Sequence, residues 1–254
     1  QVLFNVADIA VVGRFAGASA LGSVGSTTIL VTMFTSFLIG VSGGINVLTA
    51  LYLGSGDRKG VRETVHSAFL FSILTGLTLL LIGAIFSQGI LELLNTKPEL
   101  IDGAVLYIRI YFLGMPALAV YNFGNAVFSA AGDTKRPLKY LSMAGVVNII
   151  LNLFFVIVCK MDVAGVAVSS IISQYLSAAM ISVALFRSGD IYGLHRSELR
   201  LNRNKTVNII RIGIPAGLQN AIFQIANLFV QAGVNSFDAT MVAGNAAAAN
   251  ADAL

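Results

Sequence analysis

Long apolar runs separated by short polar segments make up most of the chain. Six of these runs are long enough to cross a bilayer, since a membrane-spanning helix takes about 20 residues at 1.5 Å of rise each. They lie at about 23–53, 65–94, 104–131, 138–159, 163–187 and 207–235. Shorter apolar runs stand at 1–12 and about 240–254. The pattern predicts six complete membrane helices and two partial ones, and we expect the chain to be a fragment of a longer protein.

Turn sequences rich in glycine, aspartate and basic residues separate the runs. Two examples are GSGDRKG at 54–60 and AGDTKRP at 131–137. The longest polar stretch is RSGDIYGLHRSELRLNRNK at 187–205. It divides the chain, and we expect three parts. These are a first lobe at 1–187, a cytoplasmic linker at 188–206 and the start of a second lobe at 207–254.

Composition identifies the solvent of these helices. Of the 254 residues, 56% are hydrophobic and only 11% are charged, whereas a soluble domain has about 25% charged residues. A soluble core of this size could not hide so much apolar surface, so we expect an all-α membrane protein. The net charge of +4 does not indicate a nucleic-acid partner, because the basic residues lie in short loops between apolar runs.

The same basic residues orient the helices in the membrane. Twelve of the 16 lysines and arginines lie in alternate loops, at 54–62, 132–139 and 187–211. The other four are Arg14, Lys97, Arg109 and Lys160. Because basic loops are retained in the cytoplasm, we expect the first three loops on the cytoplasmic side and the other four residues on the outer side.

Asp8 is the one carboxylate inside an apolar run. It stands six residues before Arg14, which is about 9 Å of helix, so it is expected well below the outer surface. Charged groups in lipid are costly and usually face a bundle interior or a wet cavity. We interpret Asp8 as a candidate proton or cation site; the alternative is a structural hydrogen bond to a neighbouring helix.

Amide and hydroxyl side chains recur at helical spacing inside the spans. Such stripes predict a polar cavity between helices, although interhelical hydrogen bonding alone would also account for them. The stripes are Asn122 and Asn125; Asn148 and Asn152; Ser169, Ser170, Ser173 and Gln174; and Asn220, Gln224, Asn227 and Gln231. Pro116 and Pro215 also fall inside spans, where each should bend its helix as a hinge or as a static kink.

Two segments form a possible long internal repeat. Residues 7–25 and 226–245 both run from an alanine and an aspartate or asparagine to a small-residue helix. Six predicted helices separate them, so both would point the same way across the membrane, as in the parallel repeats of some transporters.

Chemistry typical of an enzyme is missing from the sequence. It has no Cys/His cluster with metal-ligand spacing and no glycine loop with a lysine for phosphates. His66 and His195 both fall at cytoplasmic positions, and we expect surface or interfacial side chains. We therefore expect neither an enzyme nor a metal site or cofactor.

Several segments together resemble the multidrug and toxic compound extrusion (MATE) transporters. They are ADIAVVGRFAGASALGSVG in the first helix, GSGDRKG, AAGDTKRP, NIILNLFFVI, GVAVSSIISQ and IRIGIPAGLQN. The resemblance covers essentially the whole chain in order and spacing. It implies twelve helices in two six-helix lobes related by a pseudo-two-fold axis, of which this chain would hold the first lobe and the first helices of the second. It also implies a multi-pass protein of the plasma membrane, the inner membrane in a bacterium.

The activity that the resemblance implies is antiport. Organic cations and amphipathic drugs would be exported by alternating access, driven by H⁺ or Na⁺, with no other cofactor. The coupling residues would be Asp8, Asn148, Asn152 and Ser170. The resemblance also points to Asn125 as a residue of the substrate cavity, to which the polar stripes add Asn122, Gln174, Asn220 and Asn227.

The fifth span departs from the family pattern. Many members read N-x-x-x-D-P, whereas this chain has Asn152 in place of the acid and Leu153 in place of the proline. Asparagine cannot titrate, so a mechanism with two carboxylates does not fit, and the coupling ion stays open. Two alternatives also stay open: a lipid-linked oligosaccharide flippase of the same superfamily, and a membrane enzyme or structural protein that does not transport. We expect a monomer in lipid that binds small organic cations and no nucleic acid.

Overall fold

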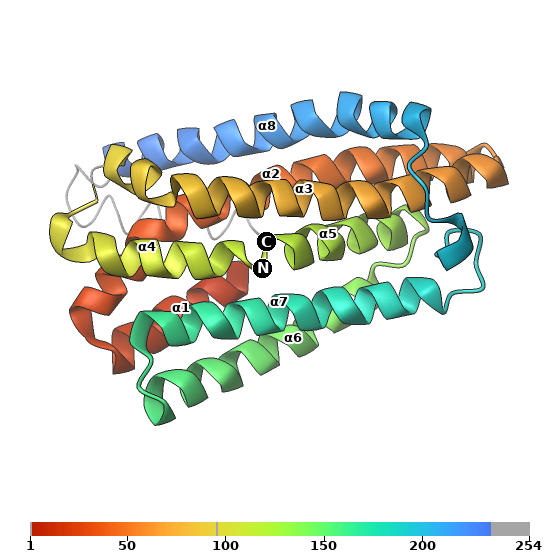
Figure 1. Ribbon diagram of the computed structural model, residues 1–254. Helices are drawn as coiled ribbons and strands as arrows, with labels where there is room; N and C mark the ends of the chain where they lie inside the picture. The colour runs from red at the N-terminus through yellow and green to blue at the C-terminus, as the bar shows by residue number, and fades with distance from the viewer. Residues whose placement is uncertain (1, 95, 235–254) are drawn as a thin grey trace.

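The computed structural model describes residues 2–94 and 96–234, and every regular element in them is helical. The described residues form eight α-helices, coloured from red to blue along the chain in Figure 1. They are α1 (Val2–Phe15), α2 (Gly17–Gly54), α3 (Arg58–Leu93), α4 (Pro98–Phe112), α5 (Met115–Ala130), α6 (Lys135–Leu153), α7 (Asp162–Phe186) and α8 (Arg203–Val234). A π-helical turn, η1 (Phe154–Val158), extends α6, and a 3₁₀ turn, η2 (Arg196–Glu198), lies in the linker.

Five described helices are long and apolar enough to cross a membrane. The predicted number of six complete spans is reached when the bent pair α4 and α5 is counted as one span. The first partial run is also helical, as α1, whereas the run at 240–254 lies outside the described residues. The chain is therefore an all-α, multi-pass membrane protein. Its division into two lobes at the linker stays a prediction.

The bend expected at Pro116 is present, and it is sharp. Helices α4 and α5 meet at 48° across a short break. Pro116 stands in the first turn of α5, where its missing N–H costs nothing. Gly76 of α3 lies against this turn, because a Cβ at that glycine would be 2.5 Å from the Cα of Pro116. By contrast, α8 continues through Pro215 without a break.

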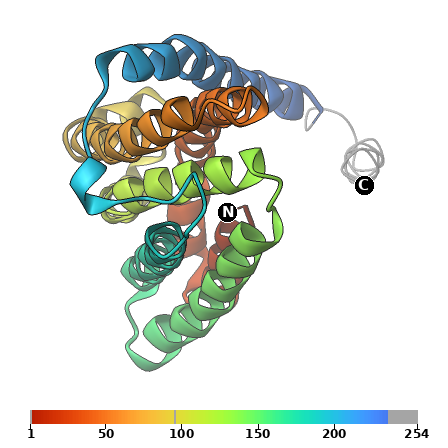
Figure 2. The same ribbon diagram turned by 90° about the vertical axis from the view of Figure 1, so that its right-hand side faces the viewer.

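The basic loops lie together in space. Figure 1 shows the α2–α3 turn, the α5–α6 turn and the linker between α7 and α8 at one end of the bundle. Figure 2, viewed along the helices, places α6 and α7 on one side and α8 on the opposite side, with α3 and α5 between them. This arrangement agrees with the alternation of basic and less basic loops in the sequence.

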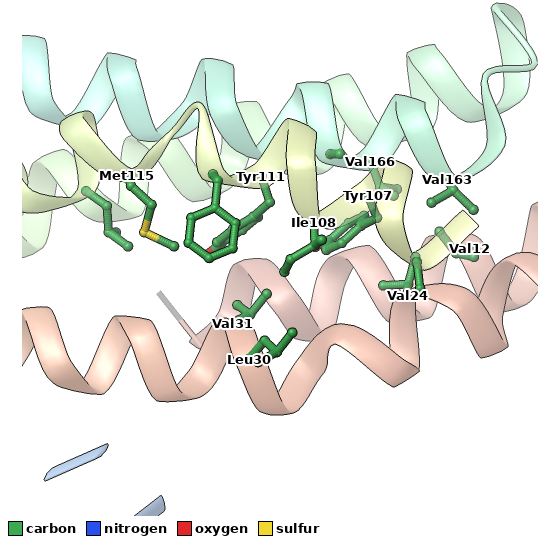
Figure 3. Packing of buried hydrophobic residues seen from close by; sticks show 14 of the residues in the cluster. Val12, Val24, Leu30, Val31, Tyr107, Ile108, Tyr111, Met115, Val163 and Val166 are labelled. Carbon is green, nitrogen blue, oxygen red and sulfur yellow. The ribbon is translucent and has the colours of Figure 1, made fainter. Parts of the chain in front are cut away.

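Two apolar clusters fill the interior, one toward each end of the bundle. In the first, residues of α2 and α4 pack together with α7, as Figure 3 shows for Leu30, Val31, Tyr107, Ile108 and Val166. The second cluster gathers α2, α3, α5, α7 and the linker around Phe123, Phe128 and Ile181. Large apolar side chains also cover the outside, among them Ile85 and Phe86 of α3, both more than half exposed. An apolar exterior of this kind suits lipid as the solvent.

Helix α8, the first helix after the linker, packs on α2 through glycines. A Cβ added at Gly40 would lie 2.5 Å from the Cα of Gly217, and one added at Gly44 would lie 2.6 Å from the nitrogen of Gly213. Only glycine allows backbones to approach this closely, a common device in membrane helix packing.

Candidate functional site

Asp8 lies on α1 with none of its surface exposed. Three side chains from three other helices donate hydrogen bonds to it. The amide of Asn152 on α6 donates to Oδ1 at 2.7 Å. The hydroxyls of Ser170 on α7 and Tyr107 on α4 donate to Oδ2, at 2.7 Å and 3.1 Å. One carboxylate thus connects four helices of the bundle.

Asn148 completes the cluster from a position beside these donors. Its Nδ2 donates to Ser170 Oγ at 3.2 Å, and its Oδ1 accepts from Asn152 Nδ2 at 3.3 Å. The four-residue spacing of Asn148 and Asn152 places both on one face of α6. All five side chains are completely buried. We call Asp8, Tyr107, Asn148, Asn152 and Ser170 the Asp8 cluster.

The backbone around the cluster is shaped by the end of α6. The α-helix stops at Leu153, directly after Asn152, and continues as the wider turn η1. Such π-helical turns often occur at functional sites, because they re-aim neighbouring side chains. A tight connection then leads into α7, with positive φ angles of 54° at Lys160 and 44° at Asp162.

Asp8 is buried without a positively charged partner among the described residues. Its three donors are neutral, and Asp8 forms no ion pair with any described residue. A buried carboxylate without a cationic partner is expensive, so it favours binding a proton or a metal cation. The oxygen of the Asn152 amide has no hydrogen-bond partner among the described residues. Carboxylate, amide and hydroxyl oxygens therefore stand together, and these are the ligands that hard cations prefer.

Sequence reasoning found four of these five residues and missed Tyr107. The structure brings Asp8, Asn148, Asn152 and Ser170, the proposed coupling set, into direct contact. Tyr107 was overlooked because tyrosine counts among the apolar residues of a span. The usable signal is that a tyrosine inside a span needs a partner for its hydroxyl. Its ring stacks on Tyr111 at a centroid distance of 5.9 Å.

The other residues assigned to a substrate cavity on α5 and α7 form no hydrogen bond with the Asp8 cluster among the described residues. Gln174 is buried on α7 against Gly114 at the α4–α5 break, and its Oε1 has no hydrogen-bond partner among the described residues. Asn122 donates back to the Leu118 carbonyl of its own helix at 2.9 Å, and Asn125 is half-buried one turn further along α5.

The stripe on α8 is also separate from the cluster. Asn220 and Asn227 are exposed on the described part of the structure, Gln224 is half-buried, and the side chain of Gln231 lies outside the description. Neither exposed asparagine contacts the Asp8 cluster. A substrate cavity formed by these residues stays a prediction.

His66 was expected to be a surface or interfacial side chain, and the surface alternative is wrong because it is only 2% exposed. The linker folds over it, and the backbone N–H of His195 donates to its Nε2 at 2.9 Å. The hydrophobic pattern of α3 could not reveal this, because the covering residues lie 129 positions away.

The fold and the site together define a multi-pass helical membrane protein with a buried polar cluster around one carboxylate. The family model described as MatE matches residues 1–154, more than half of the chain. The chain therefore belongs to the MatE family, as its motifs suggested.

Known proteins of similar sequence are named as transporters or resistance proteins. The chain is 30% identical to the "Probable multidrug resistance protein YpnP" of Bacillus subtilis, over all of this chain and 57% of that protein. It is 24% identical to a "FAD transporter" of Shewanella oneidensis, over 94% of this chain and 54% of that protein. The chain thus spans about half the length of the curated relatives it matches.

Solved structures support the fold. A MATE protein in a bent conformation matches with a TM-score of 0.87 at 22% identity, over 96% of this chain and 55% of the other. A MOP superfamily transporter from Pyrococcus furiosus matches with a TM-score of 0.87, also at 22% identity, over all of this chain and 56% of the other.

Proposed function

We propose that the full-length protein containing this chain exports organic cations and amphipathic compounds across the plasma membrane. Export would be driven by inward flow of H⁺ or Na⁺ through alternating access. The observation that carries the proposal is the fully buried Asp8, held by three neutral donors beside an unpartnered amide oxygen. Membership of the MatE family and the names of its relatives support export as the activity.

The cluster suits a site that binds and releases one cation. Without the cation, Asn152, Ser170 and Tyr107 stabilise the anionic carboxylate through their donated hydrogen bonds. When the carboxyl is protonated, one partner must accept instead of donating. The Ser170 hydroxyl can rotate to do so, and the free oxygen of Asn152 offers a second acceptor. With Na⁺, the same oxygens would act as ligands.

Cation binding at this site would be transmitted through helix packing. The donors to Asp8 come from α4, α6 and α7, so a change in their hydrogen bonds alters how α1 is held by three neighbours. A ligand shifts a conformational equilibrium only through such differential contacts. Asn152 cannot titrate, so we propose that the described lobe couples through Asp8 alone.

Two alternatives were left open by the sequence. A flippase for lipid-linked oligosaccharides should have a strongly cationic cavity, and no lysine or arginine belongs to the Asp8 cluster. A protein without transport activity is the other alternative. Neither has an observation in its favour among the described residues, so efflux is the function we propose.

Gradient-driven transport by the full-length protein tests the role of Asp8. Proteoliposomes loaded with a fluorescent organic cation are compared under imposed H⁺ and Na⁺ gradients, for wild type and Asp8→Asn. We expect the variant to lose gradient-driven transport while still binding the dye. Asp102→Asn, at an exposed carboxylate on α4, is the matched control and should transport normally. Undiminished transport by Asp8→Asn would show that Asp8 has no role in the mechanism. The gradient that drives transport by wild type identifies the coupling ion.

A further inference from the structure

The two histidines of this chain, its only ones, lie together. His66 stands on α3, and His195 directly precedes η2 in the linker, 129 residues later. Their ring centroids are 6.2 Å apart, with an angle of 25° between the ring planes. Folding therefore joins two imidazoles from separate elements at the end of the bundle that carries the basic loops.

The hydrogen bonds of His66 determine which of its ring nitrogens carries the proton. Its Nδ1 lies 2.7 Å from the backbone carbonyl of Arg62, which can only accept, so Nδ1 must be the donor. The lone pair is then on Nε2, the nitrogen nearer to His195 and Glu198. Metal-binding histidines commonly have this arrangement, with one nitrogen donating to a backbone carbonyl and the other facing the metal.

Glu198 of η2 adds an oxygen to the pair of histidines. Its Oε1 is bound by the guanidinium of Arg62, while its Oε2 lies 4.0 Å from His66 Nε2. One ligand atom each from His66, His195 and Glu198 can be chosen so that all three lie within 4.8 Å of one another. His66 and Glu198 border a pocket of about 500 Å³ that has Ser197 and Asn202 in its lining as well. His195 lines a second pocket, which shares Arg58 and Arg62 with the first.

We propose that α3 and the linker form a binding site for a divalent transition metal such as Zn²⁺, with His66, His195 and Glu198 as ligands. Two imidazoles and a carboxylate favour zinc, nickel or copper over Na⁺, Mg²⁺ or Ca²⁺. Zinc ligands stand at about 2.0–2.2 Å from the ion. The side chains of His195, which is exposed, and Glu198, which is partly exposed, can move inward to reach this distance.

The neighbouring groups limit the affinity of this site for a metal ion. Binding replaces the hydrogen bond from the His195 backbone to His66 Nε2 with a bond to the metal. Arg62 is neutralised by Glu198, but Arg58, Lys59 and Arg200 also line the pocket and repel a cation. The site is open on its pocket side, which leaves room for water as a further ligand. We therefore expect weaker binding than at a closed structural zinc site.

A bound metal would fasten the linker to the first lobe. The linker joins α7 to α8, so an ion shared by α3 and η2 would restrain the start of α8 relative to α3. This inference concerns the cytoplasmic end of the bundle and holds whether or not Asp8 couples transport.

Metal binding by the full-length protein, purified without a polyhistidine tag, tests the site. Co²⁺ serves as a spectroscopic probe, because four-coordinate Co²⁺ absorbs visible light strongly, and Zn²⁺ should displace it. We expect His195→Ala and Glu198→Gln each to weaken Zn²⁺ binding at least tenfold. His195→Ala keeps the backbone N–H that packs the linker on His66, so it separates metal binding from folding. Glu63→Gln, which changes another carboxylate lining the pocket, is the matched control and should bind as wild type does.

Trypsin cleavage of the linker gives a second readout. Zn²⁺ should slow cleavage after Arg196 and Arg200 in wild type, but not in His195→Ala. The proposal is overturned if wild type binds no metal, or if both ligand variants bind Zn²⁺ as tightly as wild type. Protection of the linker by Zn²⁺ that persists in His195→Ala would likewise overturn it.

Discussion

At the scale of single residues, the state of Asp8 depends on hydrogen bonds rather than on an ion pair. Its two oxygens are not equivalent, because Oδ2 accepts from Ser170 and Tyr107, whereas Oδ1 accepts from Asn152. Each donor stabilises the anionic carboxylate and so competes with the cation that would neutralise it. The number of donors should therefore tune how tightly the ion is held.

Tyr107→Phe tests this competition, since it removes one donor and keeps the buried ring. A hydrogen bond to a charged group contributes about 1.5–3 kcal/mol, so the driving ion should bind about tenfold more tightly or more. The ion concentration for half-maximal transport by the full-length protein measures the effect. Tyr175→Phe removes a hydroxyl that donates to the Leu113 carbonyl and should leave the ion dependence unchanged. Equal or weaker ion binding in Tyr107→Phe would contradict the competition.

At the scale of helices, the contact between α2 and α8 depends on the absence of side chains. Gly44 faces the backbone of Gly213 on α8, whereas its neighbour Gly43 has open space where a Cβ would be. The two glycines differ by one position in sequence and point to different sides of α2. They form a matched pair for measuring how much the close approach of α2 and α8 contributes to stability.

Gly44→Ala should destabilise the bundle because its Cβ would lie 2.6 Å from the nitrogen of Gly213. Overpacking of this kind costs about 1–3 kcal/mol, and backbone atoms cannot turn aside as a side chain can. Gly43→Ala should be neutral or slightly stabilising, since alanine is the better helix former. Thermal unfolding of both variants in detergent measures the difference. If both variants melted at the same temperature, the close packing of α2 on α8 would be contradicted.

At the scale of the whole molecule, the sequence predicted the spans better than the contacts between them. The spans follow from apolar runs and their breaks, which are local features, and even the bend at Pro116 has a local cause. The donors to Asp8 lie 99, 144 and 162 positions away in the sequence, and the residue that covers His66 lies 129 positions away. Asn148, Asn152 and Ser170 could be found because an amide or hydroxyl in a span is conspicuous, and through the family resemblance. Tyr107 is less conspicuous, because its hydroxyl stands on a ring that counts as apolar in a span.

The orientation of the whole bundle can be tested at its single cysteine. Cys159 is exposed in the connection between α6 and α7, at the opposite end of the bundle from the three basic loops. Because basic loops stay in the cytoplasm, a membrane-impermeant maleimide added to intact cells should label Cys159 of the full-length protein. Cys159→Ser should lose this label, which shows that the label is not on a cysteine elsewhere in the full-length protein.

A cysteine at the other end should behave in the opposite way. Ser197 is exposed in η2 within the linker. Ser197→Cys combined with Cys159→Ser should react only after the cells are permeabilised. If position 197 were labelled from outside and Cys159 were protected, the topology would be the reverse of the one we expect. The end of α1 that carries Arg14 would then face the cytoplasm instead of the outside. The side of the membrane from which a cation reaches Asp8 would be reversed as well.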